Sequence, residues 1–218
     1  MRLRNIPRAR STIEAHQDVI KEAEKQKGCW EKVFGNTAPI HIEIGMGKGR
    51  FLLQMAAGNP NVNYIGIERY SSVLLRAIER YDTQEFQDLM NVRFLCMDAH
   101  DLENIFAPGE VERIYLNFSD PWPKARHAQR RLTSLSFLER YGNIIQPGGR
   151  VEFKTDNQAL FQFSLEQVEA VEGWGLEGYT CDLHHDEAMN RGNVMTEYEE
   201  KFSEKGNPIY KLIAVRNK

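Results

Sequence analysis

The sequence predicts an α/β fold in which a mostly parallel sheet is covered by helices on both faces. Short apolar runs alternate with amphipathic stretches from residue 40 onward, which is typical of such a sheet. A glycine-rich turn follows the first run, and acidic residues follow the second and third. The 218 residues, 41% hydrophobic and 27% charged, are enough to bury the core of one α/β domain.

Five apolar runs have the length and composition of strands. They are IHIEI (40–44), VNYIGI (62–67), VRFLCM (92–97), RIYLNF (113–118) and RVEFKT (150–155). Helical patterns lie between them at about 48–57, 71–81 and 133–145, and QPGG (146–149) predicts a stop and turn. A further helix is expected near 157–171. Two β-rich stretches near 176–183 and 208–215, joined by a long polar loop, could pair as an antiparallel hairpin at one sheet edge, which makes about seven strands in all.

The N-terminal residues predict a basic arm and a helix ahead of this core. Helical periodicity runs from about Ser11 to Lys27, and CWEKVFG (29–35) closes the extension. We therefore expect a single domain over residues 1–218, with the arm and helix at 1–36 and the catalytic core at 37–218.

Composition argues against several classes of protein. No apolar stretch approaches the roughly 20 residues that cross a bilayer, and the basic start MRLRNIPRAR is not followed by an apolar signal core. Cys29, Cys96 and Cys181 lie far apart without a CxxC pair or a Cys/His cluster, which argues against disulfides and structural zinc. We expect a cytoplasmic protein without a metal ion. The sequence leaves a monomer and a homodimer equally open.

The net charge of −3 conceals an uneven distribution of cations. Two short segments without any acid carry eight of the 28 basic residues: Arg2, Arg4, Arg8, Arg10, Lys124, Arg126, Arg130 and Arg131. Without those eight, 20 basic residues face 31 acidic ones, a charge of −11. Either segment alone is most simply a solvated basic run, but together they favour local binding of a polyanion.

The first apolar run ends in a turn suited to a nucleotide-like ligand. Gly45, Gly47 and Gly49 form a G-x-G-x-G pattern, in which missing Cβ atoms allow a tight turn and close approach of a ligand. Glu68 ends the second run 21 positions after Gly47, where an acid can accept hydrogen bonds from ribose hydroxyls. A dinucleotide fingerprint would place its third glycine at position 50, which is Arg50 here.

Carboxylates at three successive strand ends identify the cofactor class. Glu43 precedes the turn, and Glu68 and Asp98 follow the second and third runs. Together they would repel a pyrophosphate, but they suit a ligand that bears an ammonium, a sulfonium and a ribose diol. We therefore predict S-adenosylmethionine as cofactor and S-adenosylhomocysteine as product. Taken alone, Asp98 is more simply a loop acid or a helix cap.

The fourth apolar run leads into an unusual loop, NFSDPWPKARHAQRRL (117–132). At the edge where ligands bind in such sheets it places Asn117, Ser119, Asp120 and Trp122. Pro121 and Pro123 prevent the segment from continuing as strand or helix. The alternative is a proline-rich turn in which Trp122 fills the core.

The sequence resembles the bacterial tRNA (guanine-N7-)-methyltransferases. The resemblance rests on EIGMGKG, YIGIE, YLNFSDPWPK, RRLT, FKTDN and GNVMTEYEEKF, and it covers nearly the whole chain. It implies a class I S-adenosylmethionine-dependent methyltransferase with a Rossmann-like sheet. The activity it implies is methylation of a guanine in the tRNA variable loop, usually at tRNA position 46.

The resemblance also assigns candidate site residues. Cofactor contacts fall on Glu43, Glu68, Asp98 and Asp120, beside the glycines of the turn, and Asp120 is also the expected catalytic residue. Substrate-binding positions fall on Lys124, Asp156, Thr196, Glu197, Tyr198 and Glu199. RNA contacts fall on Arg126, His127, Arg130 and Arg131. The family commonly has lysines where this chain has Ala125 and Gln129, which puts the strength of RNA attachment in question.

The implied chemistry needs no protein nucleophile. Guanine N7 exposes a lone pair in the ring plane, so it can attack the sulfonium methyl directly once it is placed in line. We expect Asp120 to hold the N1 and N2 donors of guanine and to face the developing positive charge, with Trp122 supporting the pocket. Asp156 and Glu199 could complete recognition of the donor edge, and Thr196 could orient a base or ribose. His184 and His185 are more simply part of a polar loop than a metal site.

Two other readings compete. An exocyclic-amine methyltransferase is suggested loosely by DPWP (120–123), but Trp122 directly after the first proline weakens that match. An RNA-binding or chaperone-like protein could have kept the fold and lost catalysis. Intact Glu43, Asp120 and the glycine turn argue against that second reading.

Overall fold

The computed structural model describes residues 5–217, so Arg2 and Arg4 of the predicted basic arm lie outside the described residues. The chain divides into two compact units, Met1–Ala107 and Pro108–Lys218. The described residues contain seven strands, in agreement with the prediction of about seven. A single methyltransferase domain over the whole chain stays a prediction.

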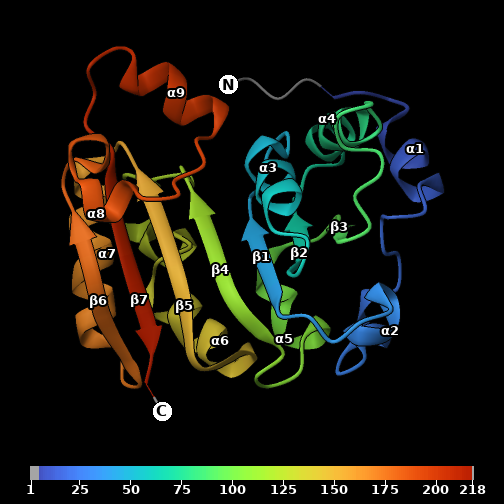
Figure 1. The fold of residues 1–218 in the computed structure, drawn as a ribbon. Helices are drawn as coiled ribbons and strands as arrows, with labels where there is room; N and C mark the ends of the chain where they lie inside the picture. The colour runs from blue at the N-terminus through green and yellow to red at the C-terminus, as the bar shows by residue number, and fades with distance from the viewer. Residues whose placement is uncertain (1–4, 218) are drawn as a thin grey trace. The chain divides into compact units, whose positions relative to one another are not determined.

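The first unit contains a three-stranded parallel sheet in the order β3-β2-β1 (Figure 1). Its strands are β1 (Ile40–Ile44), β2 (Asn63–Ile67) and β3 (Val92–Leu95). Every residue of β1 and β2 is buried, as expected for strands covered on both faces. Helices α3 (Arg50–Gly58) and α4 (Ser71–Tyr81) connect consecutive strands, so the predicted alternation is confirmed here.

The predicted helix from Ser11 to Lys27 is wrong beyond its first turns. Helix α1 (Ala9–Ala15) ends early, and the chain then runs beside β3: Phe94 N donates to Asp18 O at 2.9 Å and Ile20 N donates to Phe94 O at 3.0 Å. The edge strand β3 thereby gains backbone partners that a helix could not supply. The remaining short elements are η1 (Ala23–Gln26), α2 (Trp30–Phe34), η2 (Ala99–Asp101) and α5 (Leu102–Ile105).

The second unit contains a mixed sheet in the order β4-β5-β7-β6. Its strands are β4 (Val111–Asn117), β5 (Ile145–Thr155), β6 (Trp174–Thr180) and β7 (Tyr210–Arg216). Strands β4 and β5 are parallel, and β7 pairs antiparallel with both β5 and β6. The predicted antiparallel pair at the C-terminus is therefore confirmed.

The predicted stop and turn at QPGG (146–149) lies inside strand β5 instead. The pairing with β4 steps from Val111 and Ile145 to Arg113 and Arg150, so four residues of β5 lie opposite one residue of β4. Gly148 has φ 79°, in the region that favours glycine. The sequence thus marks a real break, but the ladder resumes after it and the strand continues.

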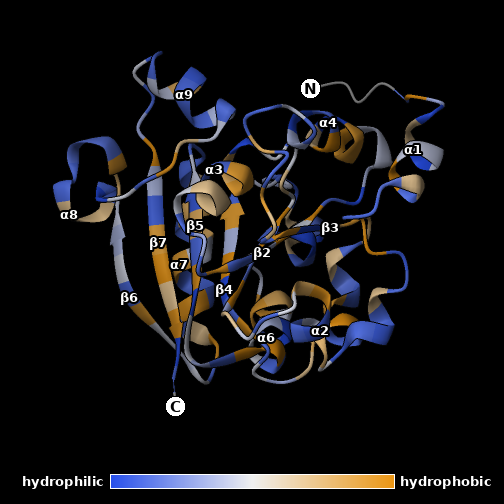
Figure 2. Cartoon of the chain, turned by 45° about the vertical axis from the view of Figure 1, so that its right-hand side comes forward, coloured by the Kyte–Doolittle hydropathy of each residue, from blue (hydrophilic) through white to orange (hydrophobic). Residues whose placement is uncertain are grey.

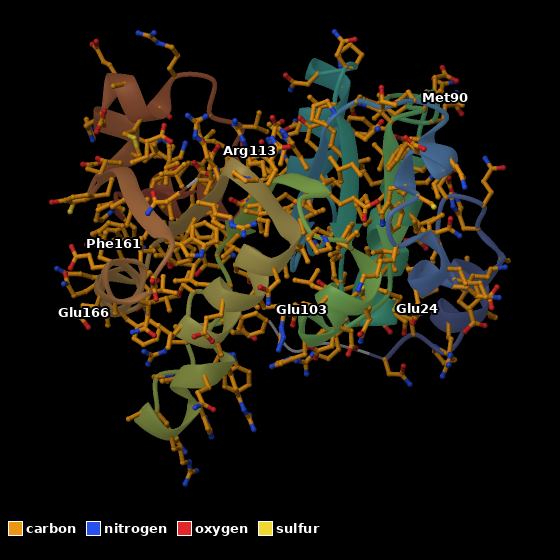
Figure 3. All side chains as sticks on the ribbon, turned by 90° about the horizontal axis from the view of Figure 1, so that it is seen from below. Glu24, Met90, Glu103, Arg113, Phe161 and Glu166 are labelled. Carbon is orange, nitrogen blue, oxygen red and sulfur yellow. The ribbon has the colours of Figure 1, made fainter. Side chains whose placement is uncertain are left out.

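Helices α6 (Leu135–Ile144) and α7 (Gln158–Ala170) belong to the second unit. Phe161 and Glu166, both labelled in Figure 3, mark the two faces of α7: Phe161 is buried and its ring lies 5.0 Å from that of Tyr210 in β7, whereas Glu166 is exposed. This one-sided burial fits an amphipathic helix on a sheet.

The predicted polar loops contain short helices. These are η3 (Ala125–Arg130), η4 (Leu183–His185), α8 (Glu187–Asn190) and α9 (Glu197–Ser203). Figure 2 shows α9 largely in hydrophilic colours. Within residues 5–217, no helix is long and apolar enough to cross a membrane.

Candidate functional site

The glycine turn follows β1 and leads into α3. Gly45, Gly47 and Gly49 have backbone φ values of 73°, 59° and 75°, which residues with a Cβ atom rarely adopt. Gly45 N donates to Ile67 O at 2.9 Å, which fixes the turn against the end of β2. The G-x-G-x-G pattern therefore reflects three left-handed positions in one turn.

Glu68 directly follows β2 and contacts this turn. Its Oε2 accepts a hydrogen bond from Gly47 N at 3.3 Å, and its Oε1 accepts one from Tyr70 N at 2.9 Å. Burial raises the pKa of Glu68 above its ordinary 4.5, although these backbone hydrogen bonds oppose the shift. The structure thus brings together the glycine and the acid that the sequence separates by 21 positions.

Glu43 and Asp98 occupy the ends of the two neighbouring strands. Glu43 lies one residue before the end of β1 and is 2% exposed. Asp98 follows β3 and accepts a hydrogen bond from His100 N at 3.0 Å, so it caps η2. Although burial opposes it, hydrogen bonds from His100 lower the pKa of Asp98. The carboxyl ends of parallel strands meet at one edge, so all three predicted acids lie along the same edge of this sheet.

In the second unit, the loop after β4 has an unusual backbone. Phe118 and Trp122 have φ values of 53° and 40°, the left-handed region that non-glycine residues rarely occupy. Phe118 N donates to Lys154 O at 2.8 Å, which holds the start of the loop beside β5. Between the two strained positions, Asp120 is exposed to solvent.

Trp122 and two arginines organise the rest of the loop. The Trp122 ring is half-buried, with the Arg130 guanidinium 5.0 Å from its centre and His127 edge-on at 5.6 Å. Arg131 donates to Pro121 O at 3.0 Å and to Trp122 O at 3.1 Å. Trp122 therefore does not fill the core, and the Arg131 side chain faces its own loop.

The predicted RNA stretch thus has two kinds of side chain. Lys124, Arg126 and Arg130 are exposed, whereas His127 and Arg131 are half-buried against the loop. The exposed three have the accessibility that a phosphate contact requires.

Asp156 and the TEYE segment (196–199) meet within the second unit. The Tyr198 hydroxyl donates to Asp156 Oδ2 at 3.2 Å. Tyr198 is 42% exposed, and its ring lies 4.9 Å from that of Phe118. Burial raises the pKa of the Tyr198 hydroxyl, and the charge of Asp156 adds to the shift. The exposed Tyr198 ring and the half-buried Asp156 carboxylate are in contact, and together they are suited to contacting a base and accepting its N–H donors.

Two members of the TEYE segment, Thr196 and Glu199, have structural roles that differ from the predicted contacts with substrate. Thr196 caps α9, because its Oγ1 accepts a hydrogen bond from Glu199 N at 2.9 Å. Glu199 is 0% exposed and is ion-paired with Lys154, Nζ to Oε2, at 2.6 Å. A buried Glu199 cannot present its carboxylate to a base edge in this arrangement, so the expectation that Glu199 helps to recognise the donor edge needs correction.

Lys154 is absent from the candidate residues that the sequence supplied. Its signal was a lysine inside the apolar run RVEFKT, since a cation in a buried strand requires a partner.

Glu197 is half-buried in the first turn of α9. His185 lies 2.9 Å from Asp182, and residues 5–217 contain no group of three or more His, Cys, Asp or Glu side chains that could hold a metal ion.

Comparison with known proteins first defines the class. A family model described as "Putative methyltransferase" matches residues 37–212. The solved structure of the 16S rRNA methyltransferase KamB matches with a TM-score of 0.65 over 87% of this chain and 93% of that chain. The two sequences are 11% identical, so this match shows a shared fold and no more. The chain has a methyltransferase fold, and the predicted class I fold with antiparallel C-terminal strands is confirmed.

Closer relatives define the family. The tRNA (guanine-N(7)-)-methyltransferase of Lachnoclostridium phytofermentans is 58% identical over 218 residues, which cover all of both chains. That of Geobacillus sp. (strain WCH70) is 54% identical over 97% of this chain and 94% of the relative. This protein belongs to the tRNA (guanine-N7-)-methyltransferase family, as its sequence motifs predicted.

Proposed function

We propose that this protein transfers the methyl group of S-adenosylmethionine to N7 of a guanine in the variable loop of tRNA. The observation that carries the proposal is full-length similarity, at 58% identity, to a relative named for this reaction. The strained loop around Asp120 and the contact between Tyr198 and Asp156 support it. A tRNA substrate also implies a cytoplasmic site of action.

The first unit supplies groups that fit S-adenosylmethionine. Glu68 is held at the glycine turn and would accept the ribose hydroxyls, while Glu43 and Asp98 would face the cationic and polar parts of the ligand. Gly45, Gly47 and Gly49 leave the turn without side chains that would obstruct it. When bound, the cofactor supplies a methyl group on a positively charged sulfur.

In the proposed mechanism, the chain positions guanine and stabilises charge. The chain would hold guanine N7 in line with the methyl group that the bound cofactor supplies, and it would stabilise the positive charge that the imidazole ring of the base gains. The Asp120 carboxylate accepts hydrogen bonds from the N1–H and N2–H groups of guanine. Because its orientation is fixed in advance, it also stabilises this positive charge. Its predicted second role, as a cofactor contact, stays a prediction.

Recognition of the substrate divides between two groups of residues. Tyr198 offers its ring to the base, and Asp156 offers its carboxylate to N–H donors. Lys124, Arg126 and Arg130 contact phosphates, whereas His127 and Arg131 keep the loop in shape. Thr196 and Glu197 act by forming the first turn of α9.

Methyl transfer to defined tRNA transcripts tests the function. Labelled S-adenosylmethionine is incubated with an unmodified transcript and with one whose variable-loop guanine is replaced by adenine. We expect label only in the first transcript, recovered as 7-methylguanosine. Label in an exocyclic amine would favour the competing methyltransferase reading. Absence of S-adenosylmethionine binding by calorimetry would favour an RNA-binding protein without catalysis.

A further inference from the structure

A buried ion pair connects β5 to the segment that contains α9. Lys154 Nζ donates to Glu199 Oε2 at 2.6 Å, and the two side chains are 4% and 0% exposed. Lys154 Nζ also donates to Asn193 Oδ1 at 3.0 Å and to Val194 O at 2.9 Å. The other oxygen of Glu199 accepts from Asn193 Nδ2 at 2.8 Å and lies 3.3 Å from His184 Nε2. One ammonium group thus contacts three residues of the segment 193–199.

A gain in folding stability does not by itself explain why the chain contains this buried ion pair. Removing two charges from water costs several kcal/mol per ion, and apolar side chains of similar volume often stabilise a fold equally well or better. An apolar pair would lack the directional hydrogen bonds from Lys154 to Asn193 and Val194. These bonds favour a role in fixing the conformation of the segment 193–199.

The fixed segment carries the exposed ring proposed to meet the base. Tyr198 adjoins Glu199 in α9, and its hydroxyl donates to Asp156, which lies two residues after Lys154. The Tyr198 ring also packs against Phe118, whose backbone N–H donates to the carbonyl of Lys154. Figure 1 shows α9 beyond the carboxyl end of β5. Lys154 therefore contacts, through its side chain and its backbone, both segments that flank the Tyr198 ring.

We propose that Lys154 is a positioning residue for tRNA binding and that it acts through Glu199. The pair holds α9 so that the Tyr198 ring is exposed and its hydroxyl orients the Asp156 carboxylate. Glu199 is then the anchor of the TEYE segment, and contact with the base belongs to Tyr198 and Asp156. This inference rests on the proposed function, because it assigns the substrate side of the same reaction.

The double variant Lys154→Met/Glu199→Met separates positioning from stability. Each single substitution leaves a buried charge without its partner, so each is expected to lower Tm strongly. The double variant removes both charges at similar volume, and its Tm is expected near that of the wild type. We expect its KM for tRNA to rise about tenfold or more, because Tyr198 and Asp156 lose the fixed arrangement in which they would meet the base. Its Kd for S-adenosylmethionine should stay within about twofold of the wild-type value.

A double variant with wild-type Tm and wild-type KM would overturn the proposal, because the pair would then contribute stability only. Amide hydrogen exchange gives a second readout, independent of activity. In Glu199→Gln, which keeps the side-chain shape, we expect exchange to accelerate most in residues 193–203, and unchanged exchange there would also overturn it. A wild-type protein that methylates no tRNA would instead refute the proposed function, and the exchange measurement would still decide the role of Lys154.

Discussion

Asp120 lies between two residues whose backbones are strained. Left-handed conformations of non-glycine residues cost on the order of 1–3 kcal/mol each and persist only where surrounding contacts fix them. Here the contacts are explicit: Lys154 O accepts from Phe118 N, and Arg131 donates to the carbonyls of Pro121 and Trp122. A loop held at both ends in this way can keep an exposed carboxylate in one direction.

Replacing Asp120 tests whether that carboxylate acts in the reaction. In Asp120→Ala we expect kcat to fall by about 100-fold to 1,000-fold, the usual effect of removing one preorganised electrostatic group. Because Asp120 is exposed, Tm should be nearly unchanged. Asp88→Asn alters an exposed acid outside the proposed site and should keep wild-type kcat. Wild-type turnover by Asp120→Ala would remove Asp120 from the mechanism.

Ionisation of Glu68 should make cofactor binding depend on pH. The raised pKa of Glu68 fixes the direction of that dependence. Its ionised carboxylate accepts hydrogen bonds, so affinity for S-adenosylmethionine should fall as pH decreases toward its pKa, which burial raises above 4.5. Since the folded-state pKa exceeds the unfolded one, the Glu68 contribution to stability is present below pH 4.5 and is lost as pH rises through the folded-state pKa. Asp98, whose pKa is lowered, stays ionised over this window.

Calorimetric titrations from about pH 8 down to about pH 5 would measure this dependence, because they approach the raised pKa of Glu68 from above. Glu68→Gln should weaken binding by about tenfold to 100-fold, the effect of losing a hydrogen bond to a charged group, and should flatten the pH profile. If Glu68→Gln kept the wild-type pH profile, another group would be responsible for it.

At the scale of elements, two adjacent arginines of the loop 117–131 have different contacts. Arg130 is exposed over Trp122, whereas Arg131 donates to backbone carbonyls of the loop. Arg130→Ala should reduce the slope of log affinity for tRNA against log salt by about one unit. Arg131→Ala should leave that slope nearly unchanged and lower kcat, because Pro121 and Trp122 lose their restraint. Binding measured at several salt concentrations would distinguish them, and equal loss of slope in both variants would place Arg131 on the RNA.

The sequence predicted elements best where the local pattern was strong. Strand β1 (Ile40–Ile44) and helix α4 (Ser71–Tyr81) have the predicted bounds, because strict alternation of isoleucine with other residues indicates a strand and a long amphipathic stretch indicates a helix. The helix at Ser11–Lys27 failed because backbone pairing with β3, a tertiary effect, overrides local propensity. Helix α9 is only seven residues long, although the T-x-x-E spacing from Thr196 is a recognised helix-start signal that could have revealed it.

The same contrast holds for the candidate site. The spacing between Gly47 and Glu68 predicted a contact that the structure contains, because the strand–turn–helix geometry repeats in such folds. The pairing of Lys154 with Glu199 joins residues 45 positions apart, and no local pattern specifies which buried charges meet. Motif similarity marked Glu199 as a substrate-binding position, but a motif carries no information on burial, and Glu199 is 0% exposed.

At the scale of the whole molecule, cations are concentrated against an acidic background. Arg8 and Arg10 are exposed and ion-paired, with Glu79 at 2.6 Å and with Glu14 at 2.9 Å. Exposed ion pairs of this kind contribute little to stability, so both arginines can exchange a carboxylate for a phosphate at small cost. The protein can therefore bind a polyanion locally although its net charge is −3.

This distribution of charge predicts that tRNA affinity depends on salt concentration. Two sets of substitutions should each remove part of that dependence. Replacing Lys124, Arg126 and Arg130 by alanine should lower the slope of log affinity for tRNA against log salt by about two to three units, at about 0.7–0.9 per phosphate contact. Replacing Arg8 and Arg10 should lower it by up to about two further units if the N-terminal segment also contacts phosphates. Lys25, an exposed cation paired with Glu22 at 2.6 Å, lies outside both segments, and its alanine variant is the matched control that should keep the full slope. A slope that falls as much in the Lys25 variant would mean that tRNA responds to total charge, and the two basic segments would lose their special role.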